Sequence, residues 1–109
     1  MNTIEVEKSS GNIFTDLGVE DADAMLAKAK LAQSILERIE SKGLKQAEAA
    51  ALLGTDQSYI SKLKKGHELR RFTFDRLMGW LLKLDRDVIL TVKQKPQNQE
   101  AGLIQVASV

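Results

Sequence analysis

Four hydrogen-bonding side chains lie close together near the middle of the chain: Gln57, Ser58, Ser61 and Lys62. On a helix whose apolar residues turn inward, all four would lie on the outward surface. Amide, hydroxyl and ammonium groups can form hydrogen bonds with base edges in the major groove of DNA. Their types and spacing therefore indicate a surface that reads DNA. The alternative is an ordinary helical hairpin with a solvated polar face.

The residues around this surface predict two helices with a sharp turn between them. Gln46, Ala50 and Gly54 fall four residues apart and are followed by the polar stretch Thr55-Asp56-Gln57. Ala50 is small at the point where a second helix must cross closely over the first. Gly54 can adopt the left-handed conformation that ends a helix and turns the chain. The segment from Gly43 to Gly66 therefore predicts a helix-turn-helix.

Helical spacing and capping residues define the remaining elements. The sequence predicts helices at about the following ranges: Asp21–Ser41, Gln46–Leu53, Gln57–Lys65 and Phe74–Leu84. A further stretch, His67–Arg71, is short and basic. Asp56 and Thr73 are suitable N-caps for the helices that follow them. Gly43 and Gly66 are expected to end the helices before them.

Apolar stripes indicate how the first and last helices face the core. In the first helix, the stripe comprises Met25, Ala29, Ala32, Leu36 and Ile39, which repeat at helical spacing. In the last helix, the predicted core residues are Leu77, Met78, Leu81 and Leu82. Trp80 lies off this second stripe, so we expect it to contact a partner subunit.

A β-prone segment follows the last helix, with Val88, Leu90 and Val92 on one face. A single strand needs a neighbour to satisfy its backbone groups. We favour pairing with its own copy across a two-fold axis, which would let a dimer read two half-sites ~34 Å apart on one duplex. The alternative is pairing with residues 103–107 of the same chain. Trp80 and the three strand residues are thus the predicted dimerisation residues.

The length of 109 residues allows one domain with a modest core. We expect a flexible arm at residues 1–11, a helix-turn-helix domain with its strand at residues 12–95, and a tail at residues 96–109 that is disordered or forms a second strand. The absence of cysteine excludes disulfides and cysteine-ligated metal sites. We find neither a signal-peptide pattern nor a run of about 18 apolar residues, so the expected location is the cytoplasm.

The net charge of +1 conceals an uneven distribution along the chain. Residues 1–40 carry four Lys and Arg against eight Asp and Glu, which gives −4. Residues 41–95 carry twelve against six, which gives +6, and Glu100 supplies the remaining −1. The positive charge coincides with the predicted helix-turn-helix, as a surface that contacts phosphates requires.

The motif and its flanks resemble the lambda-repressor-like, or XRE, helix-turn-helix family over about residues 11–95. Upstream, Asn12-Ile13-Phe14-Thr15-Asp16-Leu17-Gly18 looks like the HigA-like branch, and so does Asp87-Val88-Ile89-Leu90-Thr91-Val92 downstream. The resemblance implies an all-α, five-helix lambda-repressor-like DNA-binding domain with a short, dimer-forming C-terminal β-strand. Members of this family are small transcriptional regulators, and some are antitoxins that repress their own toxin–antitoxin operons.

The function implied by the resemblance is therefore sequence-specific transcriptional regulation. We expect an autorepressor that is also the antitoxin of a HigB/HigA-like operon. The expected partners are a palindromic operator in double-stranded DNA, a second copy of the chain and a RelE-like toxin, with no membrane. Two alternatives are a stand-alone XRE-type regulator without a toxin and a protein-binding module without DNA affinity.

The resemblance also implies roles for individual residues. Gln46 resembles the glutamine that contacts phosphate at the start of the second helix, and Gln57 and Ser58 occupy the first exposed positions of the recognition helix. The expected base contacts are Gln57, Ser58, Tyr59, Ser61 and Lys62. The expected phosphate contacts are Lys45, Gln46, Lys64, Lys65, His67, Arg70, Arg71 and Thr73. For each basic residue, the alternative role is solubility alone.

Two lysines depart from the family pattern. Lys45 stands where Ser or Thr usually caps the second helix, so Glu48 is expected to lack its capping-box partner. Lys64 stands where an acidic residue is common. Both departures add positive charge to the motif, and neither breaks it.

The remaining patterns do not indicate an enzyme. His67 is the only histidine, so a zinc site is not expected. The sequence has no Gly-rich phosphate loop and no nucleophile elbow. We therefore expect no enzymatic activity, no cofactor and no metal.

Overall fold

The computed structural model describes residues 21–107, and the predicted arm and the Asn12–Gly18 segment lie outside them. The described residues form four α-helices and one 3-10 turn: α2 (Asp21–Ser41), α3 (Gln46–Leu53), α4 (Gln57–Lys65), η2 (Leu69–Arg71) and α5 (Phe74–Lys83). The first three helices have the predicted bounds, and α5 ends one residue earlier than predicted. The prediction of five helices is wrong for residues 21–107, because the stretch before Thr73 is too short to nucleate an α-helix and forms only η2.

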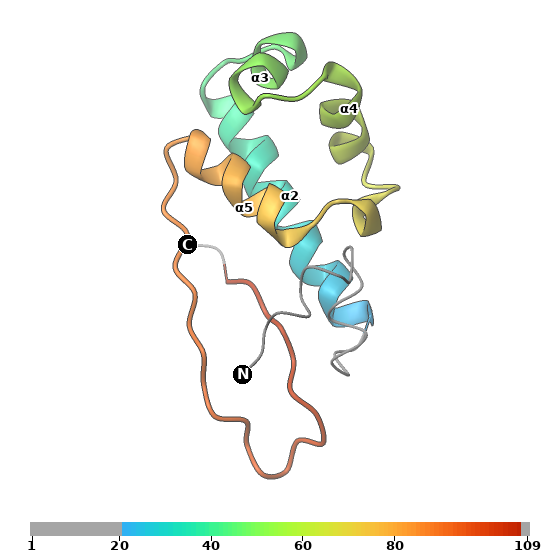
Figure 1. Ribbon diagram of the computed structural model, residues 1–109, viewed down its shortest axis with the longest axis vertical. Helices are drawn as coiled ribbons and strands as arrows, with labels where there is room; N and C mark the ends of the chain where they lie inside the picture. The colour runs from blue at the N-terminus through green and yellow to red at the C-terminus, as the bar shows by residue number, and fades with distance from the viewer. Residues whose placement is uncertain (1–20, 108–109) are drawn as a thin grey trace.

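The long helix α2 runs through the molecule, α5 lies beside it, and α3 and α4 sit together at one end (Figure 1). The buried apolar residues of α2 are Ala24, Ala27, Leu31, Ala32, Ile35 and Ile39. The predicted stripe is therefore rotated around the helix. Met25, Ala29 and Leu36 are only partly buried at the edge of the core, while Leu31 and Ile35 lie at its centre.

Of the four core residues predicted on α5, Leu77 and Leu81 are buried and Met78 is partly buried against the core, but Leu82 is not in the core. Leu77, Trp80, Leu81 and Leu84 are buried, whereas Leu82 is 58% exposed. The prediction that Trp80 contacts a partner subunit is therefore wrong. Its ring packs against Phe72 in an edge-to-face arrangement with the ring centroids 5.8 Å apart. Such a pair adds about 0.5–1.5 kcal/mol to the burial of its area, which favours Trp80 over Leu82 in the core.

The helix ends follow the predicted capping signals, with one exception. Gly43, Gly54 and Gly66 all have positive φ angles between 68° and 73°, in the left-handed region that favours glycine. The Thr73 hydroxyl accepts a hydrogen bond from the backbone N–H of Arg76 at 3.1 Å, as expected of an N-cap. Asp56 occupies the N-cap position of α4, but its side chain makes no capping hydrogen bond.

A polar cluster joins the C-terminal ends of α2 and α5. The Arg38 guanidinium donates to the Leu84 carbonyl at 2.9 Å, and the Lys42 ammonium donates to the Asp85 carboxylate at 3.1 Å. Asp85 has a φ of 66°, the only positive value among the non-glycine residues described. The cluster therefore fixes the chain direction directly after α5.

The predicted strand at 88–92 is not present in residues 21–107, which contain no β-strand. The chain after α5 instead forms a long loop that leaves the helices and returns toward them (Figure 1). Ile89, Leu90 and Val92 are 84%, 75% and 96% exposed, while Val88 is partly buried against the core. The alternative of pairing with residues 103–107 is also not observed, because the two limbs form no ladder. β-Propensity alone does not make a strand where no neighbour is aligned to receive its hydrogen bonds.

No helix within residues 21–107 is both long enough and apolar enough to cross a membrane.

Candidate nucleic-acid interface

The turn between α3 and α4 is built by small residues and a left-handed glycine. Ala49 and Ala50 are buried where the two helices cross, as the small side chain of Ala50 predicted. Gly54 donates its backbone N–H to the Ala51 carbonyl at 3.3 Å, and Thr55 donates to the Ala50 carbonyl at 2.9 Å. These two bonds satisfy carbonyls at the end of α3 and turn the chain into α4.

Helix α4 separates an apolar inner face from a polar outer face. Ile60 and Leu63 are almost fully buried. The five residues predicted to contact bases all reach the surface: Gln57, Ser58 and Tyr59 are exposed, and Ser61 and Lys62 are half-buried. The structure therefore brings all five together on one short helix.

The two glutamines at the starts of α3 and α4 are in contact. The amide nitrogen of Gln57 donates to the amide oxygen of Gln46 at 3.5 Å, a long hydrogen bond. A predicted phosphate contact thus lies directly beside a predicted base contact. The two amides therefore meet on the exposed surface of the motif, at the N-terminal ends of both helices.

The start of α3 is better capped than the sequence predicted. Glu48 accepts a hydrogen bond from the backbone N–H of Lys45 at 2.8 Å, so this half of the capping box is present. The reverse half cannot form, because an ammonium group has no lone pair with which to accept a backbone N–H. The Lys45 side chain is exposed and is therefore available to solvent or a ligand.

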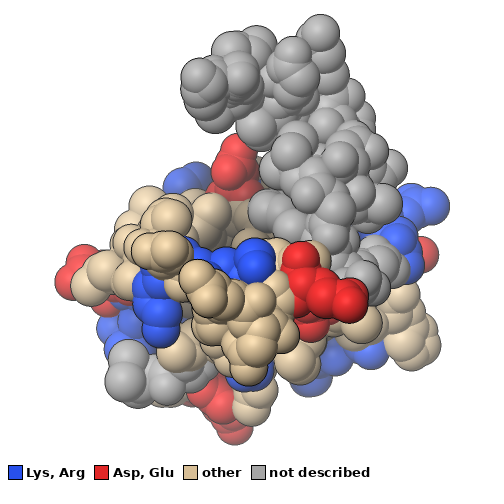
Figure 2. Space-filling model, turned by 90° about the horizontal axis from the view of Figure 1, so that it is seen from below, with Lys and Arg blue, Asp and Glu red and all other residues tan. Residues whose placement is uncertain are grey.

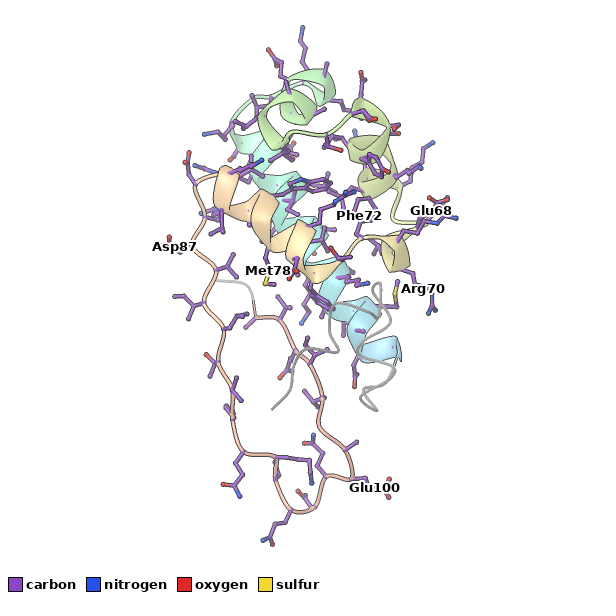
Figure 3. The ribbon with its side chains drawn as sticks, viewed as in Figure 1. Glu68, Arg70, Phe72, Met78, Asp87 and Glu100 are labelled. Carbon is purple, nitrogen blue, oxygen red and sulfur yellow. The ribbon has the colours of Figure 1, made fainter. Side chains whose placement is uncertain are left out.

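Most of the predicted phosphate contacts lie along the exit from α4. The exposed residues among them are Lys64, Lys65, His67, Arg70, Arg71 and Thr73. They follow one continuous stretch from the last turn of α4 to Thr73, the N-cap of α5. Figure 3 shows Arg70 on the outer edge of this stretch, with Phe72 pointing into the molecule. Arg71 and Thr73 of this stretch line the same surface pocket as Tyr59 and Lys62 of α4, so the exit from α4 adjoins its polar surface.

Sequence reasoning missed Arg76 of α5, which meets this surface from another helix. Its guanidinium carbon lies 5.2 Å from the ring centroid of Tyr59 and 5.9 Å from that of Trp80, within the range of cation–π attraction. Tyr59 and Arg76 also line a surface pocket of about 310 Å³, together with Lys62, Glu68 and Arg71. No local pattern connects positions 59 and 76, so only the folded chain reveals this contact.

The opposite end of the molecule has a different character. Figure 2 shows it from below, and on its described part blue and red side chains are interspersed. The segment 88–92, which carries the residues predicted to dimerise except for the buried Trp80, belongs to the loop that follows α5 (Figure 1). Among residues 21–107, no three His, Asp or Glu side chains lie close enough together to hold a metal ion.

In this domain a tight glycine turn joins α3 to α4, and α4 presents a polar face to solvent. This arrangement is a helix-turn-helix. A family model described as a helix-turn-helix domain matches residues 13–93, and the chain belongs to this family. A solved structure assigned to the XRE family of transcriptional regulators is 36% identical and has a TM-score of 0.72, and the match covers 83% of this chain and 100% of that one. A comparison with curated proteins found no match. The chain thus has an XRE-like helix-turn-helix fold, and these matches support a DNA-binding regulator.

Proposed function

We propose that this protein is a sequence-specific transcriptional regulator that binds a palindromic operator in double-stranded DNA through α4. The observation that carries the proposal is the polar outer face of α4, which lies on the side away from buried Ile60 and Leu63. A helix of this kind fits the major groove of B-DNA, where its side chains can reach base edges. Within this proposal, the protein acts by occupying DNA, and no catalytic step is required.

Base reading is assigned to the first turns of α4. Gln57 is suited to bidentate pairing with adenine, and Lys62 to donation toward guanine. Ser58, Tyr59 and Ser61 complete the base-reading set. Phosphate contacts, which fix the position of the helix without reading sequence, are assigned to Lys45, Gln46, Lys64, Lys65, His67, Arg70, Arg71 and Thr73.

The experiment that tests this proposal starts from selection of duplexes from a random-sequence library by the purified protein. Fluorescence anisotropy then compares a recovered duplex with a shuffled duplex of the same length and composition. We expect tighter binding to the recovered duplex, and affinity that falls linearly with salt on a double-logarithmic plot. A protein-binding module without DNA affinity would show neither result, and the proposal would then be rejected.

We also propose that the protein represses its own operon and is the antitoxin of a HigB/HigA-like pair. The support is the resemblance at residues 12–18 and 87–92, together with the net charge of −4 over residues 1–40. An acidic region would attract a basic RelE-like ribonuclease toxin by electrostatic complementarity. A stand-alone regulator without a toxin is the alternative.

Two measurements separate these alternatives. The reading frame adjacent to the gene should encode a small basic toxin whose growth inhibition is relieved by co-expression of this chain. Deletion of residues 1–20 should restore that inhibition while operator binding is kept. If the toxin co-purifies with the truncated chain at full strength, the proposed docking region is wrong. A reporter gene fused to the protein's own promoter tests autorepression directly.

A palindromic operator presents two half-sites, so we propose that the protein binds as a homodimer. The proposed dimer contacts are Val88, Leu90 and Val92. Trp80 is not among them, because it is buried in the core. The high exposure of Leu90 and Val92 supports this assignment, since apolar side chains on an unpaired backbone segment gain from a partner.

A further inference from the structure

An acidic side chain lies within the basic surface at the exit of α4. Glu68 directly precedes η2, and its carboxylate oxygen Oε1 lies 3.8 Å from the ammonium nitrogen of Lys62. This oxygen has no exposed surface and no hydrogen-bond partner among the described residues. A carboxylate is unfavourable beside DNA phosphates unless a cation neutralises it. Its presence at this position therefore calls for a physical explanation.

The ammonium of Lys62 is held from two directions. Glu68 approaches it from the segment after α4, and the ring centroid of Tyr59, one turn back on α4, lies 5.3 Å away. Both side chains of the ion pair are about two-fifths exposed, so solvent and a ligand can still reach them. A lysine has three donors, and the pairing with Glu68 occupies the space around only part of the ammonium.

We propose that Glu68 is a specificity-determining residue that positions Lys62 for a base edge and prevents it from binding the nearest phosphate instead. This inference rests on the proposed DNA-binding function. A lysine that is free to rotate gains affinity for any duplex, because phosphates are present at every step. A lysine drawn toward a carboxylate loses part of its attraction for phosphates, while its donors can still meet a base acceptor beside it. Glu68 thus lowers non-specific affinity and leaves operator affinity in place.

The variant that tests this proposal is Glu68→Gln, which keeps the shape of the side chain and removes its charge. Affinity for a shuffled duplex should rise about threefold to fivefold, the scale of an exposed ion pair. The salt slope on that duplex should steepen by about one unit. Affinity for a duplex recovered by selection should change little, so the ratio of the two affinities should fall by about the same factor. Circular dichroism confirms that the variant is folded.

Two further variants distinguish positioning from a simple charge effect. Asp87→Asn removes one negative charge on the opposite side of the molecule from Glu68 (Figure 3), and it should leave the ratio unchanged. In a Lys62→Gln background, Glu68→Gln should have no further effect on the ratio. If it still lowers the ratio there, Glu68 acts only through its own charge and the proposal is overturned.

The same measurements separate this proposal from the proposed function. If the wild-type protein shows no salt-dependent binding to any duplex, both the proposed function and the role of Glu68 are overturned. Wild-type protein that discriminates the recovered duplex, combined with an unchanged ratio in Glu68→Gln, would overturn the role of Glu68 alone.

Discussion

The amide of Gln57 donates a hydrogen bond to the amide oxygen of Gln46 across the turn between α3 and α4, with 3.5 Å between the two atoms. The two side chains belong to different helices, so the contact depends on the angle that Gly54 sets between them. On the proposed function, one glutamine contacts phosphate while the other reads a base. On that assignment, the phosphate-contacting side chain and the base-reading side chain lie directly side by side.

The first prediction separates base reading from phosphate contact. Gln57→Ala should weaken binding to a duplex recovered by selection by ~1–3 kcal/mol and barely change binding to a shuffled duplex. Lys65→Ala should weaken both alike and reduce the salt slope by about one unit. Fluorescence anisotropy over a range of salt concentrations measures both quantities. An unchanged affinity ratio in Gln57→Ala would mean that α4 is not the reading helix.

The second prediction concerns the backbone at the turn. Gly54 has a φ of 73°, and an added Cβ would meet only Lys83 Nζ at an ordinary 3.5 Å. Gly54→Ala should therefore lower the free energy of unfolding by ~1–2 kcal/mol through backbone conformation alone. Gly79 is the matched control, because it lies inside α5 and a Cβ added to it would have no atom within 4 Å.

Gly79→Ala should raise the free energy of unfolding by ~0.5–1 kcal/mol, since alanine favours a helix interior over glycine. Urea denaturation with comparison of midpoints at equal slopes gives both values. A neutral Gly54→Ala would contradict the account of the turn, and a destabilising Gly79→Ala would mean that an added Cβ is not tolerated inside α5.

The glycine turn is also the part of the fold that the sequence predicted best. Gly43, Gly54 and Gly66 end three helices because a left-handed residue is a local requirement, readable without knowledge of the core. Thr73 caps α5 through an equally local interaction, because its hydroxyl accepts a hydrogen bond from the backbone N–H of Arg76 three residues on. Where a few neighbouring residues decide the conformation, the predicted and observed boundaries agree.

The register of α5 could not be predicted in this way. Apolar residues cover so much of the helix that two stripes of the same period are available, one with Leu82 and one with Trp80. The choice depends on Phe72, which packs on Trp80 from the segment before the helix. The pairing of Arg76 with Tyr59 was hidden for the same reason, because the contact is tertiary. The expected strand lacked a neighbour, which β-propensity does not reveal.

The third prediction concerns the pH dependence of stability through Asp85. The hydrogen bond from Lys42, with the positive charges of Lys42 and then Arg38, lowers the pKa of Asp85 below its usual value of 3.8, although partial desolvation opposes the shift. A carboxyl whose pKa is lower in the folded state stabilises the fold above its unfolded pKa. That stabilisation is lost as the pH falls through the folded value.

Asp85→Asn should therefore lower the free energy of unfolding at neutral pH, and the difference from wild type should narrow at pH values below 3.8. Asparagine also tolerates the positive φ at this position, so the backbone is matched. Asp87→Asn is the control, since Asp87 makes no ion pair within the described residues. Urea denaturation across this pH range provides the measurement, and a constant difference would rule out the charge of Asp85 as its cause.

The fourth prediction tests the proposed dimer. The backbone N–H of Leu90 donates to no acceptor among the described residues, and its side chain is 75% exposed. Leu90→Pro should therefore leave the helices of a single chain intact. In a paired strand, alternate N–H groups point toward the partner. One of the two variants Leu90→Pro and Thr91→Pro, but not both, should therefore remove a donor that the dimer uses. The other variant serves as a matched control with the same ring and the same restriction of φ.

Light scattering at micromolar concentration should detect a wild-type dimer and a shift toward monomer in one of the two proline variants. Operator affinity should fall in that variant alone, because each half-site would then have to be bound by a separate subunit. Circular dichroism should remain unchanged in both, since Leu90 and Thr91 are exposed and lie outside the buried core formed by residues such as Ile35, Ile60 and Leu77. A wild-type monomer, or two variants that remain dimeric with full operator affinity, would place the subunit contact elsewhere. Exposed Leu82 of α5 would then be the next residue to change.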